Sequence, residues 1–358
     1  MAPFKSSLAK SAGKLLGVFR EADLSLRGAT QSSRFREIVF VDITLTNSAS
    51  NNTGGGNNYI TWTSSGAFAI DGPGLSNPIF KIDYLLIGGG GGTGGFASGV
   101  GYFNGTAGVD STALGVRAAG GGQGSRYPGV AGGAGGSGGG GGAPTGTAGA
   151  GNLYNPISPA HPGPAPGQGN PGGTGAGGGL YGGSGGGGAG QAGEGSKPNS
   201  QSGYGGYGKA AFSGDTNFPT TYGTPGPSAG RWFAGGGGGA GGTPNPSGGA
   251  HNAPGGAGGG GNGVNATPYA ASVATVNSGG GAGVICESGG GGAGGAGAGG
   301  YLEATNQSIS AATYPIVIGG GGSAPSGTAA GTGATGGSGI FVLKIPSAAQ
   351  TDIQVNFS

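Results

Sequence analysis

Glycine runs in the middle of the chain constrain the fold more than any other feature. Of the 103 glycines in 358 residues, nine precede Ile87 and none follows Gly339, so 94 fall within residues 88–339. Glycine loses more conformational entropy on folding than any other residue, and it has no side chain to bury in a core. Charged residues make up only 7% of the chain, whereas an average globular domain has about 25%. An ordinary globular enzyme is therefore not expected.

The same composition excludes two further classes of structure. A collagen triple helix needs glycine at every third position and abundant proline, but here glycine comes in unbroken runs and the chain has only 22 prolines. No apolar stretch approaches the roughly 20 residues of a membrane-spanning helix, so membrane insertion is not expected. The single cysteine, Cys286, excludes a disulfide within one chain and suits synthesis in a reducing cytoplasm.

The flanks of the glycine region have the pattern of β-structure. Residues 38–46 (IVFVDITLT) alternate apolar and polar side chains. A similar β-rich composition predicts further strands at 59–63 (YITWT), 67–70 (AFAI), 81–87 (KIDYLLI), 314–318 (YPIVI), 340–345 (IFVLKI) and 352–357 (DIQVNF). The chain thus leaves a β-structure just before the glycine region and returns to it just after. We predict four segments: an N-terminal amphipathic docking helix and linker (1–34), a β-rich segment (35–87), a glycine-rich domain with aromatic loops (88–339), and C-terminal strands that return to the β-segment (340–358).

The N-terminal segment combines positive charge with an apolar stripe. The first 40 residues hold seven of the fourteen basic residues, and apolar side chains recur at spacings of three and four, which predicts an amphipathic helix. Lys10 and Lys14 interrupt the apolar stretch, which is not typical of a secretory signal. A short isolated helix is marginal in water, so the stripe must pack on the protein's own body or on a partner chain. We favour a partner, with docking residues Phe4, Leu8, Leu15, Leu16 and Phe19.

The glycine runs allow two interpretations. Their composition is typical of disorder, but the runs are of similar length, from Gly88–Gly95 to Gly289–Gly300, and a flexible linker needs no such regularity. In a polyglycine-II helix the backbone N–H and C=O groups point outward with three residues per turn, so neighbouring chains without Cβ atoms can pair laterally. The expected fold class is therefore mostly β or irregular, with an N-terminal helix, a small β-sandwich-like segment and a glycine-rich polyglycine-II helix bundle.

Aromatic loops separate the runs and supply the side chains that glycine lacks. Residues 204–233 concentrate most of these rings in otherwise small side chains. The rings either cap the ends of the glycine lattice or bind a ligand, and sugar rings are a plausible ligand because their apolar faces stack on Tyr and Trp. The candidate receptor-binding residues are Tyr154, His161, Tyr204, Tyr207, Phe212, Tyr222 and Trp232.

Catalytic, cofactor and nucleic-acid motifs do not rise above chance. With glycine this frequent, G-x-G-x-x-G carries no information, and residues 203–210 (GYGGYGKA) lack the Ser or Thr of a phosphate-binding loop. His161 and His251 lie far apart, and no set of Cys, His or acidic residues has metal-ligand spacing. The glycine region has only five basic residues, too few to neutralise a phosphate backbone. We expect no enzymatic activity, no cofactor, no metal and no nucleic acid.

Five motifs carry a resemblance to a known class of protein. The succession YLLIGGGGGTGG (84–95), RWFAGGGGGAGG (231–242), GGGGAGGAGAGGYLEA (289–304), YPIVIGGGG (314–322) and GGSGIFVLKI (336–345) resembles the glycine-rich domains of bacteriophage tail fibres and related virion proteins, over about Lys81–Ile345. In long-tail-fibre adhesins of that class, a sandwich of polyglycine-II helices carries loops that bind the host surface. The first 29 residues resemble the N-termini of structural proteins of marine and cyanobacterial phages. The adhesins lack this N-terminal helix and β-segment, so the attachment point differs.

The resemblance implies a non-enzymatic phage virion structural protein, made in the host cytoplasm and displayed as a fibre or adhesin component that mediates host-surface attachment. Its partners would be other virion proteins through the N-terminal helix and a host surface polysaccharide or protein, and a homotrimer fits this class. Two alternatives stay open. One is a capsid decoration protein or head fibre, and the other is a cellular glycine-rich structural protein or disordered linker.

Overall fold

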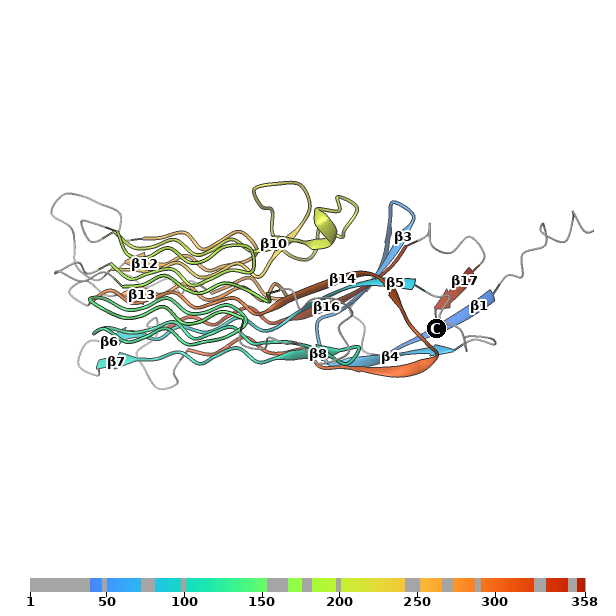
Figure 1. Ribbon diagram of the computed structural model, residues 1–358, viewed down its shortest axis with the longest axis horizontal. Helices are drawn as coiled ribbons and strands as arrows, with labels where there is room; N and C mark the ends of the chain where they lie inside the picture. Colours follow the sequence, from blue (N-terminus) through green and yellow to red (C-terminus); the bar gives the residue numbers. More distant parts are fainter. Residues whose placement is uncertain are drawn as a thin grey trace, which may run out of the picture.

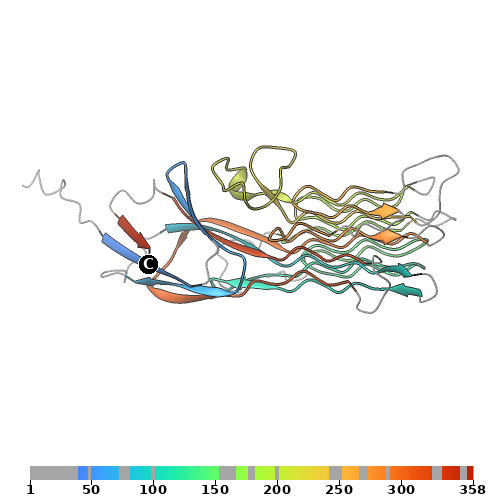
Figure 2. The same ribbon diagram turned by 180° about the vertical axis from the view of Figure 1, so that it is seen from behind.

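The molecule is elongated, with β-strands at one end and glycine segments at the other (Figure 1). The view from behind shows the glycine segments running side by side along the long axis (Figure 2). The computed structural model describes residues 39–46, 50–71, 81–97, 101–152, 167–175, 182–197, 201–241, 252–265, 273–286, 291–324, 333–346 and 353–357.

Two β-sheets form one end of the molecule. Their strands are β1 (Val39–Thr46), β2 (Ser50–Gly54), β3 (Asn57–Trp62), β4 (Gly66–Asp71), β5 (Lys81–Ile87), β14 (Tyr301–Ser308), β15 (Ala312–Ile316), β16 (Ile340–Ile345) and β17 (Ile353–Phe357). One sheet has the order β15-β4-β1-β17 and the other β14-β5-β16-β3-β2. β5 pairs antiparallel with β16, and Ile87 lies opposite Ile340. The chain therefore enters and leaves the glycine region from adjacent strands, as the sequence predicts.

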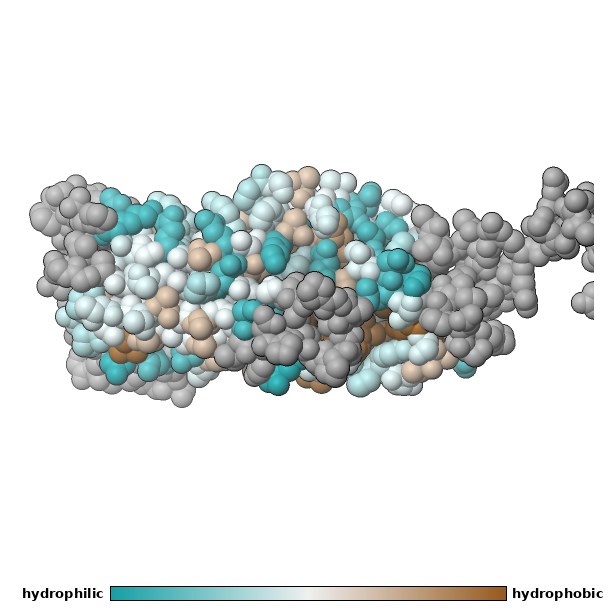
Figure 3. All heavy atoms as spheres, viewed as in Figure 1, coloured by the Kyte–Doolittle hydropathy of each residue, from teal (hydrophilic) through white to brown (hydrophobic). Residues whose placement is uncertain are grey.

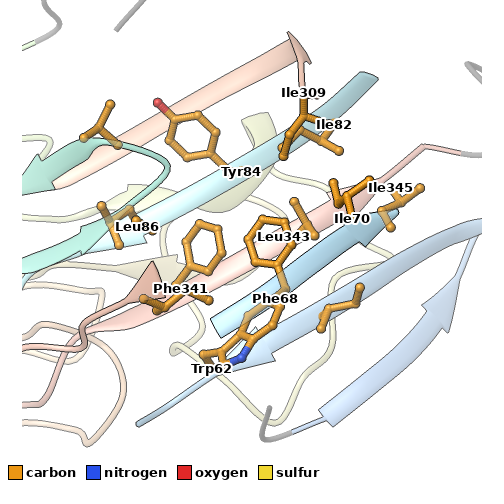
Figure 4. Packing of buried hydrophobic residues seen from close by; sticks show 14 of the residues in the cluster. Trp62, Phe68, Ile70, Ile82, Tyr84, Leu86, Ile309, Phe341, Leu343 and Ile345 are labelled. Atoms are coloured by element: carbon orange, nitrogen blue, oxygen red, sulfur yellow. The ribbon is translucent and has the colours of Figure 1, made fainter. Parts of the chain in front are cut away.

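The five-stranded sheet is buried on both faces, and β5 shows this most clearly. All of its residues from Ile82 to Ile87 are buried. Alternate residues of a strand face opposite sides of a sheet, and accordingly Leu86 belongs to the core between the two sheets, while Leu85 packs in a second cluster on the other face. In the core between the sheets, the Trp62 ring contacts the rings of Phe68 and Phe341, with centroids 5.6 and 5.5 Å apart (Figure 4).

Short strands mark the ends and edges of the glycine region. The far end carries a four-stranded sheet of β6 (Gly95–Ala97), β7 (Gly101–Phe103), β12 (Val264–Asn265) and β13 (Ile285–Cys286). Nearer the large sheets, β8 (Ser111–Ala113) pairs with β9 (Val116–Ala118), and β10 (Lys209–Ala210) pairs with β11 (Trp232–Phe233).

The glycine segments between Gly88 and Gly339 hydrogen-bond to one another and form what we call the glycine lattice. Gly88 and Gly91 donate backbone hydrogen bonds of 3.0 and 2.9 Å to Gly300 and Gly297 of one neighbouring segment. The two residues that follow Gly88 donate hydrogen bonds to two other neighbouring segments. In each case the residue three positions further along the run donates to the same segment. Donors three residues apart thus reach the same neighbour, so one segment pairs on several sides. Lateral pairing between runs, which the sequence predicts, is present.

Close approach between segments explains why the lattice consists of glycine. A Cβ added to Gly90 would lie 1.9 Å from the carbonyl oxygen of Gly280, and one added to Gly297 would lie 2.2 Å from the oxygen of Ser137. Neighbouring backbones therefore occupy the space that any other side chain needs. Most of the described surface over these segments is pale in the hydropathy view, because glycine is neither strongly polar nor apolar (Figure 3).

The expected fold class is wrong in its helical parts. The described residues form strands, extended segments and loops without an α-helix, and a three-residue 3-10 turn, η2 (Ala211–Ser213), is the helical element among them. The glycine runs are extended segments and not a helix bundle, since the described residues between Gly88 and Gly339 contain no helical element other than η2. The runs are ordered by backbone hydrogen bonds between segments that are distant in sequence. The predicted docking residues lie outside the described residues: Phe4, Leu8, Leu15, Leu16 and Phe19.

Candidate functional site

A short segment at the edge of the lattice, residues 203–208 (GYGGYG), exposes two tyrosines at regular spacing. Gly203 and Gly206 donate hydrogen bonds of 2.9 Å to one neighbouring segment, and the other two glycines of this segment donate to a second neighbour. At all four glycines an added Cβ would come within about 2 Å of a backbone oxygen, for example 2.0 Å at Gly203. Two of every three positions must therefore be glycine, and the third faces outward.

Tyr204 and Tyr207 occupy these outward positions. Their exposed fractions are 46% and 47%, among the highest of the large apolar or aromatic residues in the described part of the chain. Next to Tyr204, the Lys197 ammonium lies 4.0 Å from the ring centroid and pairs at 2.7 Å with the Glu194 carboxylate. The segment thus carries two rings on one face, with a cation over the first of them.

A shallow groove of about 520 Å³ extends from Tyr207 to Trp232. Its lining residues are Gly190, Gln191, Tyr207, Gly208, Lys209, Ala210, Ser228 and Trp232. The half-buried Trp232 is held in place by its surroundings, because its Nε1–H donates a 3.2 Å hydrogen bond to the Ser228 carbonyl. Gly226 packs so closely that a Cβ there would lie 2.3 Å from the indole ring. Burial lowers the pKa of the Lys209 ammonium, which makes no salt bridge with any residue that the structure describes.

Residues 209–233, which we call the aromatic loop, project beside β10 where the lattice meets the sheets (Figure 1). Phe218 is 2% exposed and makes edge-on ring contacts with Tyr59 and Phe233, at centroid distances of 5.6 and 5.7 Å. Phe212 is also buried and joins the same cluster on the outer face of the five-stranded sheet. The aromatic loop is therefore packed on the sheet through rings that point inward.

A buried ion pair fixes the aromatic loop to β16 and β3. The Asp215 carboxylate accepts hydrogen bonds from the Lys344 ammonium at 2.7 Å and the Tyr59 hydroxyl at 2.6 Å, and the side chains of Asp215 and Lys344 are 11% and 13% exposed. Burial acts to raise the pKa of Asp215, but the hydrogen bonds from Lys344 and Tyr59 outweigh it, so the pKa lies below its ordinary value. For Tyr59, burial and the hydrogen bond to Asp215 raise the pKa of the phenol.

A second carboxylate holds the start of the loop. Glu303 of β14 accepts a 2.7 Å hydrogen bond from the backbone N–H of Phe212 and another from the Tyr301 hydroxyl. Burial raises the pKa of Glu303 above its ordinary value, despite these hydrogen bonds. The carboxylates of Asp215 and Glu303 are thus engaged in holding the loop, and this arrangement positions side chains rather than a reacting group.

The structure separates the predicted receptor-binding residues into different environments. Tyr204 and Tyr207 are exposed, and Trp232 is half-buried at the groove. Phe212 is buried, so its predicted role as a contact residue is wrong, and Tyr222 is half-buried beside the same cluster. The remaining two, Tyr154 and His161, lie outside the described residues.

Sequence reasoning missed three features of this region. The repeat of tyrosine at every third position in 203–208 was a readable signal for an exposed face. Gln191 and Ser228 join the groove from segments that nothing in the sequence connects to it. The pairing of Asp215 with Lys344 joins residues 129 positions apart, and no local pattern indicates it.

Within the described part of the chain, no group of three or more His, Cys, Asp or Glu side chains could hold a metal ion. The residues that the structure describes also contain no helix long and apolar enough to cross a membrane. No family model, curated protein or solved structure matches the chain.

Proposed function

We propose that the chain is a non-enzymatic structural protein of a phage virion, displayed as a fibre or adhesin component that attaches the particle to the host surface. The observation that carries the proposal is the exposed pair Tyr204 and Tyr207 on a close-packed glycine segment. Such rings are costly to leave in water without a use, since aromatic side chains bury large apolar areas when they find a partner. The pattern of glycine runs resembles that of phage tail fibres and adds to this support.

The shape of the molecule agrees with a displayed component. In the elongated body the glycine segments extend away from the strand end (Figure 1), and lateral hydrogen bonds throughout the lattice give that projection a fixed form. We assign attachment to other virion proteins to residues 1–34, which lie outside the described residues. Host surface polysaccharide or protein is the proposed external partner.

Two measurements on purified particles test the proposal. Antibodies against residues 201–241, coupled to gold, should label the outer end of a fibre, and the isolated chain should compete with particles for adsorption to host cells. Label on the head shell would support the decoration-protein alternative instead. Particles that contain no copy of the chain would refute a virion role of any kind.

A further inference from the structure

The spacing between the two exposed tyrosines can be compared with the repeat of a sugar chain. In an extended chain with three residues per turn, the rise is about 3.1 Å per residue, so positions three apart recur about every 9 Å on one face. The hydrogen bonds fix this period here: Tyr207 accepts from the Gln191 N–H and Tyr204 from the Glu194 N–H, so residues three apart in one segment meet residues three apart in the next. Tyr204 and Tyr207 are therefore held at a repeat close to the length of a disaccharide unit.

The groove brings a third ring, that of Trp232, to the same surface as Tyr207. Trp232 stands at the other side of the groove, with its orientation fixed by the Ser228 carbonyl and by Gly226. Gln191, Lys209 and Ser228 supply hydrogen-bonding side chains to the lining, and none of the lining residues is acidic. The surface thus combines flat apolar rings with amide, ammonium and hydroxyl groups, which is what a pyranose with one apolar face and a rim of hydroxyls requires.

We propose that Tyr204, Tyr207 and Trp232 form a platform for a linear polysaccharide with equatorial linkages, whose flat sugar rings stack on the aromatic rings while Gln191, Lys209 and Ser228 bind hydroxyl groups. An equatorially linked chain is a straight ribbon that presents equivalent faces at every second sugar, and this repeat matches the row. A helical, axially linked chain curves away from it. The inference rests on the proposed function for its biological setting, since it names the class of host molecule bound.

Single-stranded nucleic acid is the main competitor, because bases also stack on exposed rings. It requires several cations along its backbone. Here Lys197 is paired with Glu194, and Lys209 is the only charged residue in the groove lining. The charge at the platform therefore favours a sugar chain over a polyphosphate.

Isothermal titration of the full-length chain with cello-oligosaccharides, from disaccharide to hexasaccharide, tests the platform. Affinity should rise with length until the row is covered, and malto-oligosaccharides of equal length should bind at least about tenfold more weakly. Tyr207→Ala should lower the affinity for cellohexaose about tenfold, in line with the loss of one stacked ring, and Tyr207→Phe should retain it. Val109→Ala, at a valine 56% exposed on another lattice segment, should have no effect.

Several results would overturn the platform. Among them are equal binding of the two oligosaccharide series, unchanged affinity in Tyr207→Ala, or tighter binding of an oligothymidylate than of cellohexaose.

A competition assay for adsorption to host cells separates this inference from the proposed function. If the wild-type chain and Tyr207→Ala block adsorption equally, attachment stands and the platform falls. If the wild-type chain binds cellohexaose but does not block adsorption, the platform stands and attachment by this chain falls.

Discussion

The substitution Gly90→Ala is the most direct test of the close packing in the glycine lattice. The new Cβ would lie 1.9 Å from the Gly280 oxygen, whereas ordinary contact begins at 3.4 Å, so the two segments must separate by about 1.5 Å. Gly90 donates a 2.9 Å hydrogen bond to Gly337 and accepts a 2.8 Å bond from Gly322, and half that displacement takes either bond beyond the usual N···O limit of about 3.2 Å. Losing two buried backbone hydrogen bonds at about 1–3 kcal/mol each predicts a destabilisation of about 2–6 kcal/mol.

The matched control is Gly320→Ala in the same lattice. A Cβ at Gly320 meets nothing within 4 Å and the residue is exposed, so alanine there should be neutral or should stabilise by about 0.4–1 kcal/mol through the unfolded chain. Urea unfolding followed by the fluorescence of buried Trp62 measures both variants. If Gly90→Ala and Gly320→Ala unfold within about 0.5 kcal/mol of each other, the segments are not packed as closely as the structure has them.

Three further predictions concern the aromatic loop and the tyrosines. Asp215→Asn should destabilise the chain by about 3 kcal/mol at neutral pH, because it removes the nearer of the two carboxylates beside the buried Lys344 ammonium and leaves Asp83 at 3.9 Å. Because the folded pKa of Asp215 is lowered, this difference should shrink as pH falls below about 4, and a pH-independent difference in urea midpoint would contradict it. Phe218→Ala should cost about 3–5 kcal/mol and speed amide hydrogen exchange in residues 209–233, whereas unaltered exchange would show that the ring does not hold the loop. The double substitution Tyr204→Ala and Tyr207→Ala should change the free energy of unfolding by less than about 0.5 kcal/mol, and a larger loss of stability would show that the two rings stabilise the fold.

The strands of the flanks could be predicted because their signal is local. Alternation of apolar side chains in 38–46 and the apolar runs in 81–87 and 340–345 are direct consequences of burial on one or both faces. The sequence also predicted that the glycine region leaves and re-enters one β-structure, and the structure adds the register, in which Ile87 lies opposite Ile340. The strand predicted at 314–318 overlaps β15, which forms an edge of the four-stranded sheet. What the sequence could not specify is that β14, inside the segment assigned to the glycine domain, would form an edge of the five-stranded sheet.

The glycine region was harder because its order comes from contacts between segments distant in sequence. Each run is nearly uniform, so no local pattern reports which neighbours it pairs with, and the expectation of helices followed from the similar lengths of the runs. Phe212 shows the same difficulty on the scale of one residue. It shares its surroundings in sequence with the exposed tyrosines, yet the hydrogen bond of its backbone N–H to Glu303 holds it against the sheet. Exposure here depends on long-range partners that neighbouring residues do not reveal.

The lattice also determines which positions of the chain can be substituted without loss of the fold. At Gly203 and Gly206 any side chain collides with a neighbouring backbone, so these positions must remain glycine whatever the protein binds. Tyr204 and Tyr207 directly follow these two glycines, and their side chains are about half exposed, so other residues there leave the backbone hydrogen bonds intact. A surface that must keep pace with a changing host ligand needs this separation between positions that hold the fold and positions that make contact. The three-residue repeat of 203–208 provides it, because this segment offers one free position after every two that packing fixes.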